Sequence, residues 1–126
     1  MTTAKNAKKI LIVEDDKPMS RALELKLNNS GFTVKAVYDG EEAVAELSKN
    51  KYDLMLLDLM MPKMDGFGVL AALKEKKIKL PIIVSTNLSQ ESDVARAKSL
   101  GAADYFIKSD TPISAVVEHV KKVLGI

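Results

Sequence analysis

The 126-residue sequence contains no cysteine, which excludes disulfides, thiol chemistry and zinc–thiolate sites. It has no run near the ~18 apolar residues that a membrane-spanning helix needs, and residues 1–8 lack the apolar stretch of a secretory signal peptide. The net charge of only +2 offers no basic footprint for nucleic acid. These absences predict a cytoplasmic protein that contacts neither a membrane nor nucleic acid directly.

The composition is that of a globular domain, with 47% hydrophobic and 29% charged residues. A chain of this length suits one domain with its own core, so we assign residues 1–7 to a polar tail and 8–126 to the domain. The charge run at residues 74–79 predicts a solvated helix end. His119 lies among polar neighbours in the last predicted helix, which favours a surface role over a catalytic one.

Short apolar runs alternate with stretches of helical period along the chain. This alternation predicts an α/β domain with a parallel sheet and right-handed crossovers, although it does not give the strand order. The predicted strands are residues 9–14, 32–37, 52–58, 80–86 and 104–107, with the second near an edge. The predicted helices are residues 19–29 (with Pro18 in the first turn), 41–50, 66–76, 89–100 and 113–124.

Polar side chains stand where the apolar strands end. Glu14 and Asp15 follow the first strand, Asp58 closes the third, Thr86 closes the fourth and Lys108 follows the fifth. All strands of a parallel sheet end at one edge, where open α/β sheets keep their ligand sites, so these groups can converge. The simpler alternative is that Asp58 only caps the turn into the loop behind it.

Three carboxylates in one pocket need a compensating charge. Two unit charges ~4 Å apart interact by about 4 kcal/mol at an effective dielectric of about 20. Shared protons, a lysine or a divalent cation could offset this, and oxygen ligands without His or Cys suit Mg²⁺ better than softer metals. Such a site beside an aspartate, a lysine and a hydroxyl fits phosphoryl transfer to the aspartate as an acyl phosphate. A purely structural acidic cluster remains the alternative.

Four motifs carry a resemblance to a known family. They are residues 12–16 (IVEDD), residues 57–62 (LDLMMP) followed by Asp65 and Gly66, Thr86, and residues 101–108 (GAADYFIK). They occur in order, with 43 residues from Asp15 to Asp58, 28 from there to Thr86 and 22 more to Lys108. Over residues 8–125 the chain resembles the receiver domain of bacterial two-component response regulators, of the chemotaxis-regulator type.

The resemblance implies a fold and a function. The fold is a doubly wound, flavodoxin-like (βα)5 domain with a five-stranded parallel sheet in the order 2-1-3-4-5. The function is to accept a phosphoryl group from a sensor histidine kinase or a phosphotransfer protein and to signal to a downstream protein. Such a domain is no enzyme beyond promoting its own Mg²⁺-dependent phosphorylation and dephosphorylation. A second copy of the chain could dock on the phosphorylated form to give a homodimer.

The resemblance also assigns roles to the residues at the acidic end of the sheet. Asp58 is the phosphoacceptor and a metal ligand. Asp15 binds Mg²⁺ directly, Glu14 helps through water or hydrogen bonds, and the backbone carbonyl of Met60 is a further ligand. Asp16, one residue past the acidic pair, is expected to cap the first helix instead.

Three further residues take roles in phosphoryl binding and signalling by the same resemblance. Thr86 holds a phosphoryl oxygen through its hydroxyl, and Lys108 pairs with the phosphoryl group. Tyr105 is the aromatic switch that turns inward when Thr86 moves. The surface made by the fourth helix, the fifth strand and the fifth helix then changes and signals to the partner.

The sequence departs from the family pattern at three positions. Ser85 precedes Thr86, so the hydroxyl assignment depends on a one-residue register. Asn87 stands where Ala or Gly is usual, and its bulk is expected to narrow access to Asp58. Ser109 replaces the usual proline after Lys108, which predicts a trans peptide, a re-routed loop and an altered placement of Lys108.

Alternative functions follow from the same residues. An Asp-nucleophile phosphatase would need an acid/base Asp at position 60, where this chain has Met60. A flavin-binding module would need a phosphate loop after the first strand, where residues 14–16 are acidic and would repel phosphate. A receiver-like interaction module that no longer takes phosphate stays open. The chain could act alone or be part of a longer regulator.

Overall fold

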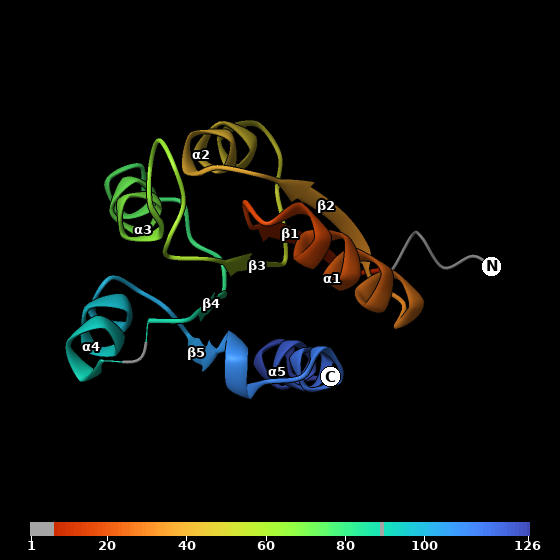
Figure 1. Ribbon diagram of the computed structural model, residues 1–126. Coiled ribbons are helices and arrows are strands. Elements are labelled where there is room, and N and C mark those ends of the chain that lie inside the picture. The colour runs from red at the N-terminus through yellow and green to blue at the C-terminus, as the bar shows by residue number, and fades with distance from the viewer. Residues whose placement is uncertain (1–6, 89) are drawn as a thin grey trace.

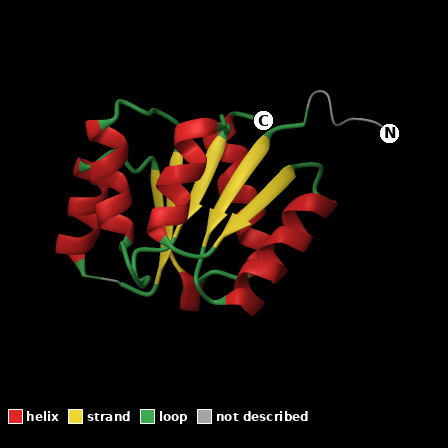
Figure 2. Cartoon of the chain, turned by 90° about the horizontal axis from the view of Figure 1, so that it is seen from above, coloured by secondary structure: helices red, strands yellow, loops and turns green. Residues whose placement is uncertain are grey.

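The apolar runs of the sequence form one parallel sheet in the computed structural model, which describes residues 7–88 and 90–126. The strands are β1 (Lys9–Val13), β2 (Thr33–Val37), β3 (Leu54–Leu57), β4 (Ile82–Thr86) and β5 (Asp104–Ile107). They lie in the order β2-β1-β3-β4-β5, and all four pairings are parallel, as the aligned arrows of Figure 2 show. The α/β class and the order 2-1-3-4-5 are therefore confirmed.

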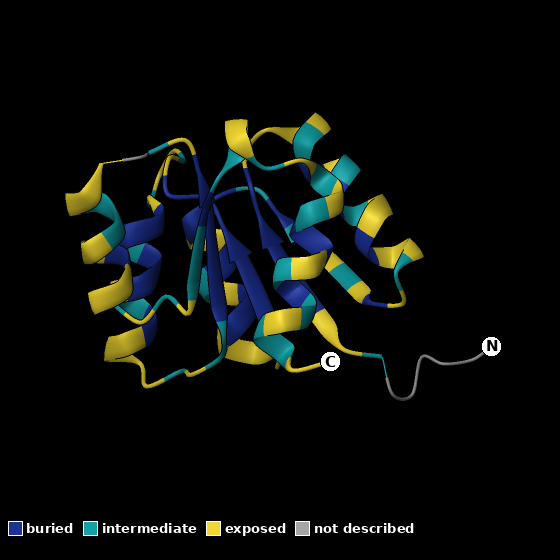
Figure 3. Ribbon diagram, turned by 90° about the horizontal axis from the view of Figure 1, so that it is seen from below, coloured by how far each residue is buried: buried dark blue, intermediate teal, exposed yellow. Residues whose placement is uncertain are grey.

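Helices cover both faces of the sheet (Figure 1). One face packs against α1 (Lys17–Asn29) and α5 (Ile113–Leu124), and the other against α2 (Gly40–Lys49), α3 (Gly66–Glu75) and α4 (Glu91–Ser99). The central strands are dark blue throughout in Figure 3 because they are buried on both sides. Double burial explains why their sequences are continuous apolar runs rather than alternating ones. No described helix has the length and apolar character required to cross a membrane.

Several predicted strands extend beyond the strands of the structure. The third strand spans Leu54–Leu57 rather than residues 52–58, and the fourth begins at Ile82, one residue after Pro81, which lacks a backbone N–H for the ladder. The predicted start of the fourth helix, at residue 89, lies outside the described residues, and α4 begins at Glu91. Residues 1–6 of the predicted tail also lie outside the described residues.

Three aspartates begin the helices at the acidic edge of the sheet. Asp16, Asp39 and Asp65 are the N-caps of α1, α2 and α3, and each accepts a hydrogen bond of 2.8–3.2 Å from the backbone N–H three residues later. The predicted capping role of Asp16 is confirmed. These carboxylates are committed to the backbone, which leaves Glu14, Asp15 and Asp58 for other chemistry.

Gly66 holds α3 against the loop that follows the acidic strand end. A Cβ at this position would lie 2.5 Å from the Asp58 carbonyl oxygen and 2.6 Å from the Leu59 Cα. Because both atoms are backbone and cannot move aside cheaply, we expect Gly66→Ala to lower the free energy of unfolding by about 1–3 kcal/mol in urea titrations.

Gly68 supplies the matched control for that substitution. A Cβ there would meet the flexible side chain of Met64 at 2.8 Å, and the next nearest atom is the side-chain oxygen of Asp65 at 3.5 Å. Replacing glycine by alanine inside a helix gains up to ~1 kcal/mol, so Gly68→Ala should be neutral or stabilising. Equal losses in the two variants would contradict the close-approach explanation.

Candidate functional site

The carboxylates of Glu14, Asp15 and Asp58 meet at the C-terminal edge of the sheet. Each offers an oxygen that lies within 4.8 Å of the others. Glu14 and Asp58 are buried, with exposed fractions of 2% and 4%, whereas Asp15 is exposed. Strands β1 and β3 are neighbours in the sheet. The residues that follow them therefore lie close together, which brings the three carboxylates into one cluster as the sequence predicted.

Lys108 reaches into this cluster from the end of β5. Its Nζ lies 2.5 Å from Glu14 Oε1 and 3.1 Å from Asp58 Oδ2. Burial raises the pKa of Glu14 to about 7; the Asp58 charge adds to this rise, while Lys108 opposes it. Burial also acts to lower the pKa of Lys108, but its hydrogen bond to Glu14 and the charge of Asp58 outweigh burial and raise that pKa. The lysine is therefore held in its charged form between two carboxylates.

Backbone N–H groups already donate hydrogen bonds to two of these carboxylates. Glu14 Oε2 accepts a hydrogen bond of 3.1 Å from the Asp16 N–H, and Asp58 Oδ1 accepts one of 3.1 Å from the Met60 N–H. Within the described residues Asp15 makes no side-chain hydrogen bond or ion pair. Of the three, Asp15 has the carboxylate most available to a cation from solvent.

Thr86 and Tyr105 both hold the backbone of Leu88. Thr86 is fully buried, and its Oγ1 accepts a hydrogen bond of 3.4 Å from the Leu88 N–H, while the Tyr105 hydroxyl donates to the Leu88 carbonyl at 2.6 Å. Ser85 faces the other side of the sheet, where it lines a small cavity with Phe106 and Lys108. Because successive strand residues face opposite sides, only Thr86 shares the face of α4 and Tyr105.

Ser109 lies in the loop after β5, next to Lys108, which stays in contact with the cluster. No described peptide bond is cis, and Lys108–Asp110 form a single 3₁₀ turn. The Ser109 N–H donates to Asn87 Oδ1 at 3.1 Å, a link that no sequence pattern indicated. The trans peptide agrees with the prediction, and the Lys108 ammonium lies 3.1 Å from Asp58 Oδ2.

An open hollow of about 500 Å³ leads to the acidic cluster. Its wall includes Asp15, Met60, Phe67 and Leu88. Met60 is 58% exposed at its rim. Asn87 is exposed and does not line this hollow, and the expected narrowing of access to Asp58 by its bulk stays a prediction.

His119 lies at the other end of β5 from the acidic cluster. Its Nδ1 is 2.7 Å from Asp104 Oδ2, and its ring stacks on Phe106 with centroids 5.2 Å apart. The side chain is 32% exposed. His119 is thus half-buried and packs α5 against β5, rather than standing free on the surface as the sequence predicted.

The fold and the cluster define the class of protein. A parallel five-stranded sheet carries a buried Asp, two acidic neighbours and a lysine at its C-terminal edge, the arrangement expected of a receiver domain. The family model of the response regulator receiver domain matches residues 10–120. The chain belongs to this family of two-component signalling, whose members are signalling domains rather than enzymes in the usual sense.

The sequence is also similar to named transcriptional regulators. The chain is 38% identical over 117 residues to the alkaline phosphatase synthesis transcriptional regulatory protein PhoP of Bacillus subtilis, covering 93% of this chain and 48% of that protein. It is 42% identical over 120 residues to the probable transcriptional regulator ycf27 of Porphyridium aerugineum, covering 90% and 50%. The chain thus spans about half the length of these relatives.

Solved structures show the same architecture. The Francisella response regulator 1452 receiver domain superimposes with a TM-score of 0.88 at 27% identity, covering 94% of this chain and 97% of that one. The signal receiver domain of a histidine kinase from Syntrophus aciditrophicus gives 0.84 at 36% identity, covering 94% and 91%. Receiver domains of this family typically bind Mg²⁺ and are phosphorylated.

Proposed function

We propose that this receiver domain accepts a phosphoryl group on Asp58 in the presence of Mg²⁺, and that a sensor histidine kinase or a phosphotransfer protein supplies the group. The observation that carries the proposal is the cluster itself, in which oxygens of Glu14, Asp15 and Asp58 lie within 4.8 Å of one another and Lys108 is 3.1 Å from Asp58. A Mg²⁺-dependent mass gain of one phosphoryl group, absent in Asp58→Asn, tests it.

The donor set fits a hard divalent cation. It consists of oxygen atoms, it carries more negative charge than Lys108 alone can offset, and it opens to solvent at Asp15. Glu14, Asp15, Asp58 and the backbone carbonyl of Met60 would hold the ion. Bound there, Mg²⁺ would neutralise charge on the phosphoryl oxygens in the transition state.

The transfer step uses the remaining groups of the cluster. An Asp58 carboxylate oxygen attacks phosphorus, the new O–P bond forms, and the P–N bond to the donor imidazole breaks with its electron pair going to the ring nitrogen. Lys108 leaves its contacts with Glu14 and Asp58 to pair with a phosphoryl oxygen. The Thr86 hydroxyl, one strand away, donates a hydrogen bond to another.

The contacts of Leu88 suggest how the modification changes the surface. When the Thr86 hydroxyl turns toward the phosphoryl group, the Leu88 N–H loses its acceptor. The Leu88 carbonyl is the group that holds the Tyr105 hydroxyl at 2.6 Å, so the loop and Tyr105 rearrange together. The face of α4, β5 and α5 then presents a different shape to a protein partner or a second copy of the chain.

Tyr105 should report this change directly. We expect the amide shifts of residues 88–108 and the ring signals of Tyr105 to move when beryllofluoride and Mg²⁺ are added, as observed by NMR. In Tyr105→Phe the hydrogen bond to the Leu88 carbonyl is already lost, so the added shift at Leu88 should shrink. Changes limited to the immediate surroundings of Asp58 would show that Tyr105 is a fixed core residue.

Asn87 should prolong the life of the phosphoryl group. We expect Asn87→Ala to shorten the lifetime of phosphorylated Asp58, measured as loss of the label after donor removal, because the Lys108 loop loses its tether at Ser109. Asn87→Leu keeps the bulk but not the acceptor oxygen, so it should behave like the alanine variant. A lifetime like that of the unchanged protein in Asn87→Leu would instead favour steric shielding.

The names of the relatives concern the predicted absence of a nucleic-acid partner. Several are named as transcriptional regulators, so the prediction that nucleic acid plays no direct part is not supported for the protein as a whole. The cytoplasmic location and the division into residues 1–7 and 8–126 stay predictions. An interaction module that takes no phosphate is the competing function, and it predicts no mass gain at Asp58 under any condition.

A further inference from the structure

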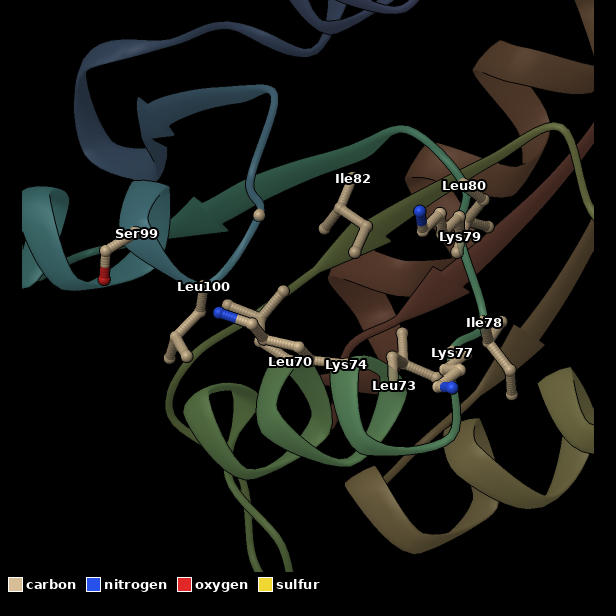
Figure 4. A pocket seen from close by; sticks show the side chains of 11 residues that line it. Leu70, Leu73, Lys74, Lys77, Ile78, Lys79, Leu80, Ile82, Ser99 and Leu100 are labelled. Atoms are coloured by element: carbon tan, nitrogen blue, oxygen red, sulfur yellow. The ribbon is translucent and has the colours of Figure 1, made fainter.

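The edge of the sheet opposite Asp58 carries two hollows on either side of residues 77–81. The first, of about 300 Å³, lies between α3 and the C-terminal end of α4, and its apolar floor includes Leu70, Leu73, Ile82 and Leu100. Figure 4 shows these side chains around a common space. The second, of about 380 Å³, lies beside α2. The two share Ile78, Lys79 and Leu80, so they adjoin at this segment, and the pair is called a groove below.

The charged residues that line the two hollows are all lysines, although the Glu46 carboxylate lies behind the second hollow, where it accepts hydrogen bonds from Asn50 and Tyr52. Lys74, Lys77 and Lys79 line the first hollow, Lys51 and Lys79 line the second, and no acidic residue lines either. All four are exposed, and within the described residues none forms an ion pair. The charge run at residues 74–79 is thus a solvated helix end, as predicted, but one that borders an apolar groove.

Lys77 lies in the turn that follows α3. It follows Lys76, the C-cap of α3, and lies in the left-handed region with φ of 60°, a conformation that costs a non-glycine residue ~1–2 kcal/mol and that glycine usually fills. Its N–H still bonds the Lys74 carbonyl at 3.2 Å. The Ile78 N–H also donates to the Leu73 carbonyl at 2.9 Å, so this is a helix-ending turn, and it places Lys77 in the lining of the first hollow.

We propose that this groove, named here the basal groove, binds an acidic protein segment in an extended conformation. Apolar side chains of the segment fill the two hollows, and carboxylates beside them pair with Lys51, Lys74, Lys77 and Lys79. Two adjoining hollows, each bordered by lysines, suit successive side chains of one peptide better than a compact small molecule. An apolar floor does not suit the phosphate backbone of a nucleic acid, which would need only the lysines. The site is independent of phosphorylation at Asp58.

The test uses a fluorescein-labelled peptide with a central Leu-Phe-Leu flanked on both sides by glutamates, titrated with the whole chain. We expect saturable binding by anisotropy and amide shifts confined to residues 47–52, 70–82 and 99–101. Lys74→Glu combined with Lys77→Glu should weaken binding about tenfold or more, since two attractive pairs become repulsive. Asp58→Asn should bind the peptide as the unchanged protein does.

Matched controls separate the proposal from general charge attraction. Lys26→Glu combined with Lys122→Glu makes the same change in net charge in the last turns of α1 and α5 and should leave binding unchanged. A peptide with glycines in place of Leu-Phe-Leu should bind weakly. Equal binding by that peptide, equal loss in both double variants, or binding of a DNA duplex but not of the acidic peptide would overturn the proposal.

Discussion

Phosphorylation with acetyl phosphate or phosphoramidate should add the mass of one phosphoryl group to this protein, and only when Mg²⁺ is present. Asp58 is buried at 4% exposure, and its Oδ2 lies 3.1 Å from the Lys108 ammonium, so its attack on phosphorus occurs beside a fixed positive charge. Removing Mg²⁺ with a chelator should slow labelling by about two orders of magnitude or more, the scale of lost charge stabilisation. Intact mass spectrometry measures both.

Asp58→Asn is the control for that experiment, because the amide keeps the size of the side chain but is a poor nucleophile. It should show no mass gain under conditions that label the unchanged protein completely. Asp15 and Asp65 lie nearby and could in principle be modified instead, so peptide mapping should place the label on Asp58. An equal mass gain in Asp58→Asn would show that the acceptor is another residue.

Asp15→Ala should weaken Mg²⁺ binding more than Glu14→Ala or Asp16→Ala, by about tenfold or more, the scale seen when groups at a metal site are removed. Asp15 is exposed and makes no hydrogen bond or ion pair within the described residues, so its oxygens are free for the ion. Glu14 is already engaged by Lys108 and the Asp16 N–H. Magnesium titration followed by NMR ranks the three variants.

Asp16→Ala should instead lower stability. Its side chain caps α1 by accepting the Met19 N–H at 3.2 Å, and loss of such a cap costs about 1 kcal/mol. Its melting temperature should therefore fall while its Mg²⁺ affinity stays near that of the unchanged protein. If Asp16→Ala were the variant with the weakest Mg²⁺ binding, the register of ligands after β1 would be wrong by one residue.

The candidate site was largely predictable because parallel strands all end at one edge. Glu14, Asp15, Asp58 and Lys108 each follow an apolar strand, and the structure places their side chains in one cluster. The choice between Ser85 and Thr86 rested on spacing, and the alternation of faces along β4 puts Thr86 on the side of Tyr105. Their roles in phosphoryl transfer await the experiments above.

Contacts between loops could not be predicted from the sequence. Asn87 and Ser109 lie on different loops, and nothing in either segment predicts that one side chain accepts the other's N–H at 3.1 Å. The hydrogen bond from the Tyr105 hydroxyl to the Leu88 carbonyl could not be predicted from the sequence either. Such a bond depends on the relative placement of two elements within a few tenths of an ångström.

The sequence alone determined the class of fold, the cap at Asp16 and the set of groups at the acidic edge, because hydrophobic period and local turn chemistry are properties of short segments. Tertiary structure decided which oxygens are free, since that depends on which backbone groups lie opposite them: Glu14 and Asp58 are engaged, and Asp15 is not. It also decided that the lysines of residues 74–79 border an apolar groove, because α3, α4 and β4 enclose it only when packed together.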